Sequence, residues 1–327
     1  MSILQHARSL MGARDDRWPP AKVSLALQGG GSFGAFTWGV LDRLLEEETL
    51  DVASLSGASA GAINGVILAS GLAHGGRDEA RCRLARFWRR MIEDAAFLPF
   101  ASLHGLLAST PAGLLTRAFS PAQFNPFDLN PLRKALAAEV DFRSLRDPAS
   151  PRLLVATTRV SDGALRIFRN EEISVDVVLA SACLPLIHRT VEIDGEAYWD
   201  GGYAANPPIL PLVHESDLTD LLIVQLTPTQ GMRVPTTPSE ISRRLDQINF
   251  NSALNTELAA LDLARKVRAT PKLQTLRIAR LAAEDQIDGL AERSAADLGR
   301  AFIEALHAGG RRAADGWLAH GPSALAA

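Results

Sequence analysis

Ser59 lies in the stretch Gly57-Ala58-Ser59-Ala60-Gly61, a pattern typical of a nucleophilic serine at a sharp turn between a strand and a helix. In such a turn the glycines lack the β-carbons that would collide in so tight a bend, and the serine hydroxyl is pushed outward. Residues 50–56 can form the strand, and residues 62–70 can form a helix that ends near Gly71. The pattern therefore predicts that Ser59 is a nucleophile, with an ordinary loop of small residues as the alternative.

Asp200 is the candidate base for this serine. It ends an apolar, strand-like run and is followed by Gly201 and Gly202, which let the backbone turn beside the carboxylate, and then by Asn206. If the strands end at one edge of the sheet, where α/β proteins place their sites, Asp200 lies near Ser59. The alternative is an aspartate that only begins an Asp-Gly turn. Free aspartate has a pKa of about 3.9, so we expect a partly dry site that raises its proton affinity.

A glycine-rich loop is the third candidate. Gly29, Gly30, Gly31 and Gly34 follow a strand-like run and precede a helical pattern, and their spacing also matches a dinucleotide-binding fingerprint. That class of site expects an acidic residue at the end of the second strand, whereas Asp51 stands at its beginning. We therefore favour an oxyanion hole, with the N–H groups of Gly30 and Gly31 as the best donors and a helix dipole behind them.

Histidine, cysteine and metal chemistry are less well supported. A Ser-Asp-His order of the α/β-hydrolase kind would need His214, His307 or His320 as the base, and none of them lies in a distinctive motif. Cys82 and Cys183 have neither metal-site spacing nor a disulfide framework. We expect no metal and no organic cofactor.

Local patterns predict the elements that carry these residues. Two strand-turn-helix units follow one another before residue 71, which favours a parallel sheet with helices on both faces. Further strands are predicted at 152–159, 164–168, 191–199, 221–226 and 273–278, with hairpin turns at Asp162-Gly163 and Asp194-Gly195.

Two long helices are predicted in the C-terminal part of the chain. Thr237, Pro238 and Glu240 form a capping-box signal for the first, which Pro271 terminates. We expect its apolar positions to be buried, namely Ile241, Leu245, Ile248, Leu254, Leu258 and Leu261. The second is expected from about residue 294 to 318.

Composition bounds the class of protein. The chain has 327 residues, of which 47% are hydrophobic, so it can bury a large core. Its 34 basic and 37 acidic side chains give a net charge of -3, which makes nucleic acid an unsuitable partner. We expect a leader at 1–20, a single domain at 21–320 and a tail at 321–327, in a cytoplasmic protein without a signal peptide or a membrane-spanning helix.

Two segments leave alternatives open. Residues 79–93 form an arginine-rich helical pattern, for which a solvated face is favoured over attraction to anionic lipid headgroups. Residues 95–127 are apolar, rich in Pro, Gly and Phe and without a clear period. They form either a cap over the site or irregular packing between helices.

The three motifs, in this order, resemble the signatures of the patatin-like phospholipases. They are residues 29–34 (GGGSFG), 57–61 (GASAG) and 200–202 (DGG), and the stretches 180–185 and Asn206-Pro207 also resemble that family. The similarity runs from about Val23 to Pro211. It implies a three-layer α/β/α fold with a central, mostly parallel sheet. One departure is Phe33, because many relatives carry a basic residue there.

The resemblance also implies an activity. It makes Ser59 the nucleophile and Asp200 the base of a dyad, with the Gly29 to Gly34 loop as the oxyanion hole. The expected reaction is hydrolysis of phospholipids, lysophospholipids or related acyl esters through an acyl-enzyme, with transient contact to a membrane surface as a further expectation. The competing predictions are a nucleotide-binding oxidoreductase and a catalytically weak acyl-lipid-binding module.

Overall fold

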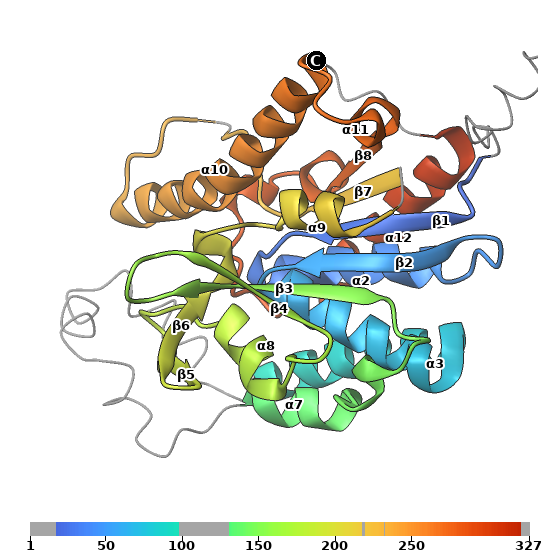
Figure 1. Cartoon of the computed structure of the whole chain (residues 1–327). Helices are drawn as coiled ribbons and strands as arrows, with labels where there is room; N and C mark the ends of the chain where they lie inside the picture. The colour runs from blue at the N-terminus through green and yellow to red at the C-terminus, as the bar shows by residue number, and fades with distance from the viewer. Residues whose placement is uncertain (1–17, 98–130, 218–219, 232, 322–327) are drawn as a thin grey trace, which may run out of the picture.

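A mostly parallel sheet forms the centre of the computed structural model, which describes residues 18–97, 131–217, 220–231 and 233–321 (Figure 1). Within these residues eight strands join in the order β5-β6-β3-β2-β1-β7-β8, and β4 pairs with β3. The run from β3 to β8 is parallel, whereas β4, β5 and β6 are antiparallel to their neighbours. The strands are β1 (Lys22–Leu27), β2 (Asp51–Gly57), β3 (Arg152–Arg159), β4 (Leu165–Arg169), β5 (Val191–Ile193), β6 (Glu196–Asp200), β7 (Asp220–Gln225) and β8 (Arg277–Ala282).

Helices cover both faces of this sheet (Figure 1). They are α2 (Gly34–Leu44), α3 (Ala60–Phe97), α7 (Pro131–Glu139), α8 (Val175–Ser181), α9 (Ile209–Glu215), α10 (Pro238–Lys266), α11 (Pro271–Thr275) and α12 (Arg300–His320). Short 3-10 turns complete the described elements, namely η1 (Gly31–Phe33), η2 (Ser144–Arg146), η3 (Gly201–Tyr203), η4 (Ala283–Asp285) and η5 (Leu290–Glu292).

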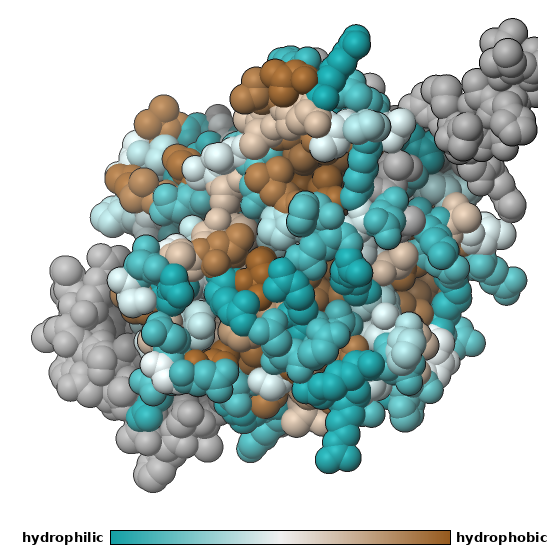
Figure 2. All heavy atoms as spheres, in the orientation of Figure 1, coloured by the Kyte–Doolittle hydropathy of each residue, from teal (hydrophilic) through white to brown (hydrophobic). Residues whose placement is uncertain are grey.

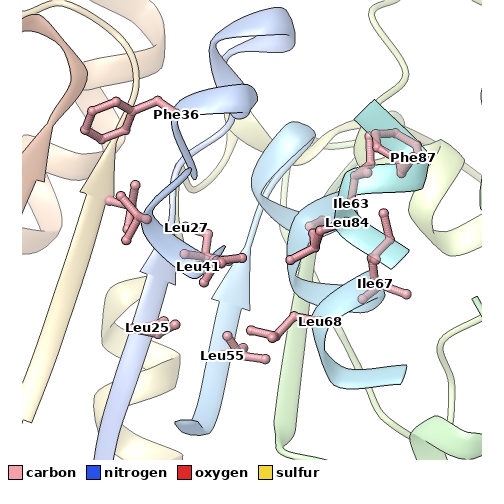
Figure 3. Packing of buried hydrophobic residues seen from close by; sticks show 14 of the residues in the cluster. Leu25, Leu27, Phe36, Leu41, Leu55, Ile63, Ile67, Leu68, Leu84 and Phe87 are labelled. Atoms are coloured by element: carbon pink, nitrogen blue, oxygen red, sulfur yellow. The ribbon is translucent and has the colours of Figure 1, made fainter. Parts of the chain in front are cut away.

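The alternation of side chains along the strands divides the core into two layers. Leu25 and Leu27 of β1 point to the larger cluster, which they share with α2, α3, α7, α8 and α12, whereas Ala26 between them points to the smaller cluster with α9 and α10. Figure 3 shows the larger cluster, in which Leu27 and Leu55 of the sheet pack near Leu41 and Leu68 of the helices. The predicted three-layer α/β/α architecture is confirmed.

Several predicted boundaries need correction. The helix after the serine does not end near Gly71: α3 continues to Gly76, whose φ of 76° breaks it, and a second helical segment follows. The strand predicted at 273–278 lies later, at 277–282, because residues 271–275 form α11. The last helix begins at Arg300 instead of residue 294. Both predicted hairpins are present, with Gly163 and Gly195 at positive φ.

The predicted buried face of α10 is wrong in its N-terminal half. The capping box of Thr237 and Glu240 is formed, and Leu254 and Leu261 are buried. Ile241, Leu245 and Ile248 are exposed, and the buried positions nearby are the polar Gln247 and Asn251. Helical spacing shows that apolar residues share a face, but not which face meets the core.

Some predictions fall on residues that the structure does not describe. Most of the expected leader (1–20), of the segment 95–127 and of the tail (321–327) lies there. Among the described helices, none combines the length and the apolar character needed to cross a bilayer.

Candidate active site

The turn between β2 and α3 has the geometry of a nucleophile elbow. Ser59 is only partly buried and has a φ of 52°, a left-handed conformation that a residue with a side chain rarely adopts. A β-carbon on Gly57 would lie 2.6 Å from the backbone nitrogen of Ala62, and one on Gly61 would collide with the Leu27 carbonyl oxygen. The glycines are therefore required by close packing, and the strained serine presents its side chain at the end of the strand.

The C-terminus of α8 holds this elbow in place. The backbone N–H of Ser59 donates to the Ser181 hydroxyl at 3.0 Å and to the Ser181 carbonyl oxygen at 3.1 Å. Ser181 is fully buried. Sequence reasoning noted residues 180–185 only through family resemblance and gave Ser181 no role. The available signal in the sequence was a serine at the end of an apolar helical run.

Asp200 ends β6 and is fully buried beside the elbow. Its backbone N–H donates to the Cys183 carbonyl oxygen at 2.9 Å, and its carbonyl oxygen accepts from the Thr158 hydroxyl at 2.8 Å. The carboxylate oxygen Oδ1 accepts the Gly202 N–H at 2.7 Å. The other oxygen, Oδ2, is buried and has no hydrogen-bond partner among the described residues. One half of the carboxylate is thus fixed, and the other half is available for a proton.

The surroundings of Asp200 make its carboxylate a stronger base. Burial raises the pKa of Asp200 to about 7, while the Gly202 N–H and the Ser59 hydroxyl act in the opposite direction by stabilising the charged form. A carboxylate with this pKa can accept a proton near neutral pH, as general-base catalysis requires.

The glycine loop lies directly against Ser59. A β-carbon on Gly29 would lie 2.8 Å from the Ser59 β-carbon, and the Gly29 N–H donates to the Asn206 side-chain oxygen at 2.7 Å. The Gly34 N–H is used inside the turn. The N–H groups of Gly30 and Gly31 have no partner among the described residues, so they are the donors left for an oxyanion.

Comparison with known protein families identifies the family of this chain. The family model for patatin-like phospholipases matches residues 25–213, which is more than half of the chain and includes all three motifs. The chain belongs to the patatin-like phospholipase family. Hydrolysis of lipid acyl esters is the activity of that family, and its fold is the patatin fold seen here. A search of curated proteins found no match.

Three solved structures are similar to this patatin-like chain. VipD from Legionella pneumophila is 16% identical, with 92% of this chain and 67% of that chain covered and a TM-score of 0.46. The type III effector ExoU is 18% identical, with 92% and 53% covered and a TM-score of 0.38. ExoU in its complex with SpcU from Pseudomonas aeruginosa is 19% identical, with 74% and 52% covered and a TM-score of 0.35. This chain spans about half the length of the ExoU chains.

A buried polar network behind the patatin glycine loop was missed in the sequence. The Gln28 side-chain oxygen accepts the N–H groups of Leu226 and Thr227 at 2.7 and 2.8 Å, and its amide donates to Asn251 of α10 at 3.1 Å. Gln28 is fully buried immediately before Gly29. A glutamine at the end of an apolar strand, next to the glycines, was the signal that could have found it.

The alternative catalytic residues lie elsewhere in this patatin-like fold. His307 approaches Asp42, with 3.4 Å between its Nε2 atom and the carboxylate, and His320 bonds its own helix. His214 belongs to α9, and none of the three hydrogen-bonds Ser59 or Asp200. No three His, Cys, Asp or Glu side chains within the described ranges are grouped so as to hold a metal ion.

The structure also places no acidic residue where a nucleotide-binding site would need one, at the end of β2. Asp51 is exposed at the start of β2 and pairs with Arg77, whereas β2 ends at Gly57 beside the elbow.

Phe33, which departs from the family pattern, is buried and makes an edge-to-face contact with Phe302, with 6.0 Å between the ring centres. The glycine loop therefore has backbone donors but no cation from this position.

Proposed function

We propose that the protein is a serine acyl hydrolase that cleaves carboxylic esters of phospholipids, lysophospholipids or related lipids through a Ser59-Asp200 dyad. The observation that carries the proposal is the buried Asp200 carboxylate, with one oxygen unpartnered, beside a serine in an elbow and next to two free N–H groups. No other residues among those described combine a strained nucleophile, a base and oxyanion donors.

The first half of the proposed reaction forms an acyl-enzyme. Asp200 accepts the hydroxyl proton as the Ser59 oxygen attacks the ester carbonyl carbon. The negative charge that develops on the carbonyl oxygen is bound by the N–H groups of Gly30 and Gly31, each of which contributes about 2.7 to 4 kcal/mol by analogy with other oxyanion donors. The intermediate then collapses, and Asp200 returns the proton to the departing alcohol.

The second half releases the fatty acid. A water molecule attacks the acyl-enzyme carbonyl while Asp200 accepts one of its protons, and the same N–H groups bind the second oxyanion. Collapse breaks the bond to Ser59, which regains its proton from Asp200. The dyad therefore carries both steps without a cofactor.

Labelling with a fluorophosphonate probe tests this proposal. The wild type is expected to form a covalent adduct at Ser59 and to hydrolyse p-nitrophenyl butyrate, whereas Ser59→Ala is expected to do neither.

Asp200→Asn is expected to lower turnover at least a hundredfold, because the side chain no longer has a carboxylate oxygen that accepts the serine proton. Replacing His214, His307 and His320 by alanine provides the matched control and leaves turnover in place. Lipid bound by a wild type that forms no adduct would favour the weak lipid-binding module instead.

A further inference from the structure

Six large apolar residues are exposed on the segments around Asp200. They are Leu186 and Ile187 in the loop after α8, Tyr203 in η3, and Ile241, Leu245 and Ile248 in the N-terminal half of α10. Their exposed fractions range from 43% to 93%. We call these six residues the apolar rim.

Each segment of the apolar rim is tied to the Asp200 turn. The loop with Leu186 and Ile187 begins just after Cys183, whose carbonyl oxygen accepts the Asp200 N–H. Tyr203 lies in η3, the turn that follows Asp200 directly. Phe250 of α10 packs so closely on Gly202 that a β-carbon on Gly202 would collide with the Phe250 ring. The centres of the Phe250 and Tyr203 rings lie 5.5 Å apart. The apolar rim therefore borders the proposed active site.

The N-terminal half of α10 has the reverse of the usual amphipathic arrangement. Its inner side buries Gln247 and Asn251, which bond to the Ala291 carbonyl oxygen and to Gln28, while its outer side exposes three aliphatic residues. A helix at a water-facing surface normally shows the opposite pattern. In Figure 2, apolar surface is visible on the left, over the N-terminal end of α10 in Figure 1.

Burial of these side chains by a partner would be favourable. Removing one Leu or Ile from water contributes about 1.5 to 3 kcal/mol. The charged side chains beside the apolar rim on α10 do not repel an anionic partner. The negative charge of Glu240 is balanced by its ion pair with Arg233, and Arg243 on the same half of the helix adds a positive charge. Asp246 is the exposed acidic neighbour on that half, and the positive charge of Arg243 offsets its negative charge.

We propose that the apolar rim docks on the surface of a lipid bilayer and brings the active site to its ester substrate. The inference rests on the proposed function, because the rim borders that site and the substrate resides in the bilayer. The six residues protrude from three separate segments, and fluid hydrocarbon accommodates such side chains without a complementary shape. The cavity along α10 is lined largely by polar side chains such as Arg244, Gln247 and Asn251, which does not fit an apolar partner helix.

Co-sedimentation with vesicles tests the docking surface. The full chain carrying Ser59→Ala is mixed with vesicles of equal parts phosphatidylcholine and phosphatidylglycerol, so that hydrolysis does not change the lipid. Adding Leu245→Glu and Ile248→Glu is expected to weaken partitioning about tenfold or more. Val267→Glu is the matched control, since Val267 is exposed at the other end of α10, about 33 Å along the helix from Leu245 at 1.5 Å per residue. Thermal unfolding verifies that every variant is folded.

The outcomes separate docking from catalysis. Equal vesicle binding with and without the two glutamates, or no binding by the Ser59→Ala chain, overturns the docking proposal. A dimer seen by sedimentation velocity and abolished by the glutamates also overturns it, because a second copy then covers the apolar rim. A failed docking proposal leaves wild-type hydrolysis of p-nitrophenyl butyrate intact, whereas a failed proposed function removes that hydrolysis and leaves vesicle binding.

Discussion

At the scale of single residues, the pKa of Asp200 links the site to a measurable pH dependence. Burial raises this pKa to about 7, and only the ionised carboxylate can accept the serine proton. We expect kcat/KM for p-nitrophenyl butyrate to rise about tenfold per pH unit below pH 7 and to level off above it. A profile that is flat from about pH 5 to pH 8 would contradict Asp200 as the base.

The same residue is expected to lower the stability of the folded protein at alkaline pH. The folded-state pKa of about 7 lies above the ordinary value of 3.8, so the native state holds its proton more tightly than the unfolded chain. The stability that this group contributes is complete below about pH 4 and is lost as the pH rises through about 7. Three pKa units correspond to at most about 4 kcal/mol.

Asp200→Asn tests this effect, because asparagine keeps an oxygen for the Gly202 N–H but carries no charge. Scanning calorimetry at pH 8 is expected to give a higher melting temperature for the variant than for the wild type, while at pH 4 the difference is small. A variant that melts below the wild type at both pH values would show that the buried charge has an unrecognised partner.

At the scale of elements, Gln28 connects β1, the turn after β7 and α10 immediately behind the glycine loop. Gln28→Ala leaves the buried N–H groups of Leu226 and Thr227 without an acceptor, and we expect it to lower the free energy of unfolding by about 3 kcal/mol. Because Gly29 adjoins this network, we expect the factor by which kcat for p-nitrophenyl butyrate falls to be larger than the factor by which KM changes. Gln274→Ala, at an exposed glutamine that bonds the end of α10, is the control for both measurements. An active Gln28→Ala enzyme would show that the loop keeps its position without the network.

The elements also show what the sequence could and could not predict. The elbow, the hairpins and the capping box depend on residues close together in the chain, and they were predicted at their places. Ile241, Leu245 and Ile248 were predicted to be buried, but they are exposed. The side of α10 that faces the core is set by polar partners such as Gln28, which come from a distant part of the sequence. Ser181 and Gln28 were missed for the same reason, since their bonding partners lie 122 and 223 residues away and the local sequence shows only a polar residue at the end of an apolar run.

At the scale of the whole molecule, the family match ends at residue 213, but the sheet does not. Strand β7 pairs with β1 in parallel, β8 pairs with β7, and α12 packs closely on α2, where a β-carbon on Gly310 would collide with the Phe36 carbonyl oxygen. The residues after 213 therefore complete the sheet next to the strand that ends in the glycine loop, and they also supply α10 with its part of the apolar rim.

Removing that part of the chain is consequently expected to unfold the rest. A chain that ends at Glu215 loses β7 and leaves β1 as an open edge, and it also exposes the apolar side chains that β7, β8 and α12 cover. Circular dichroism is expected to show no cooperative thermal transition, and size-exclusion chromatography should show aggregates. A chain that ends at Gly321 keeps every described element and serves as the control. A monomeric, cooperatively melting and hydrolytically active 1–215 fragment would show that the matched region folds alone and that the later strands and helices only add to it.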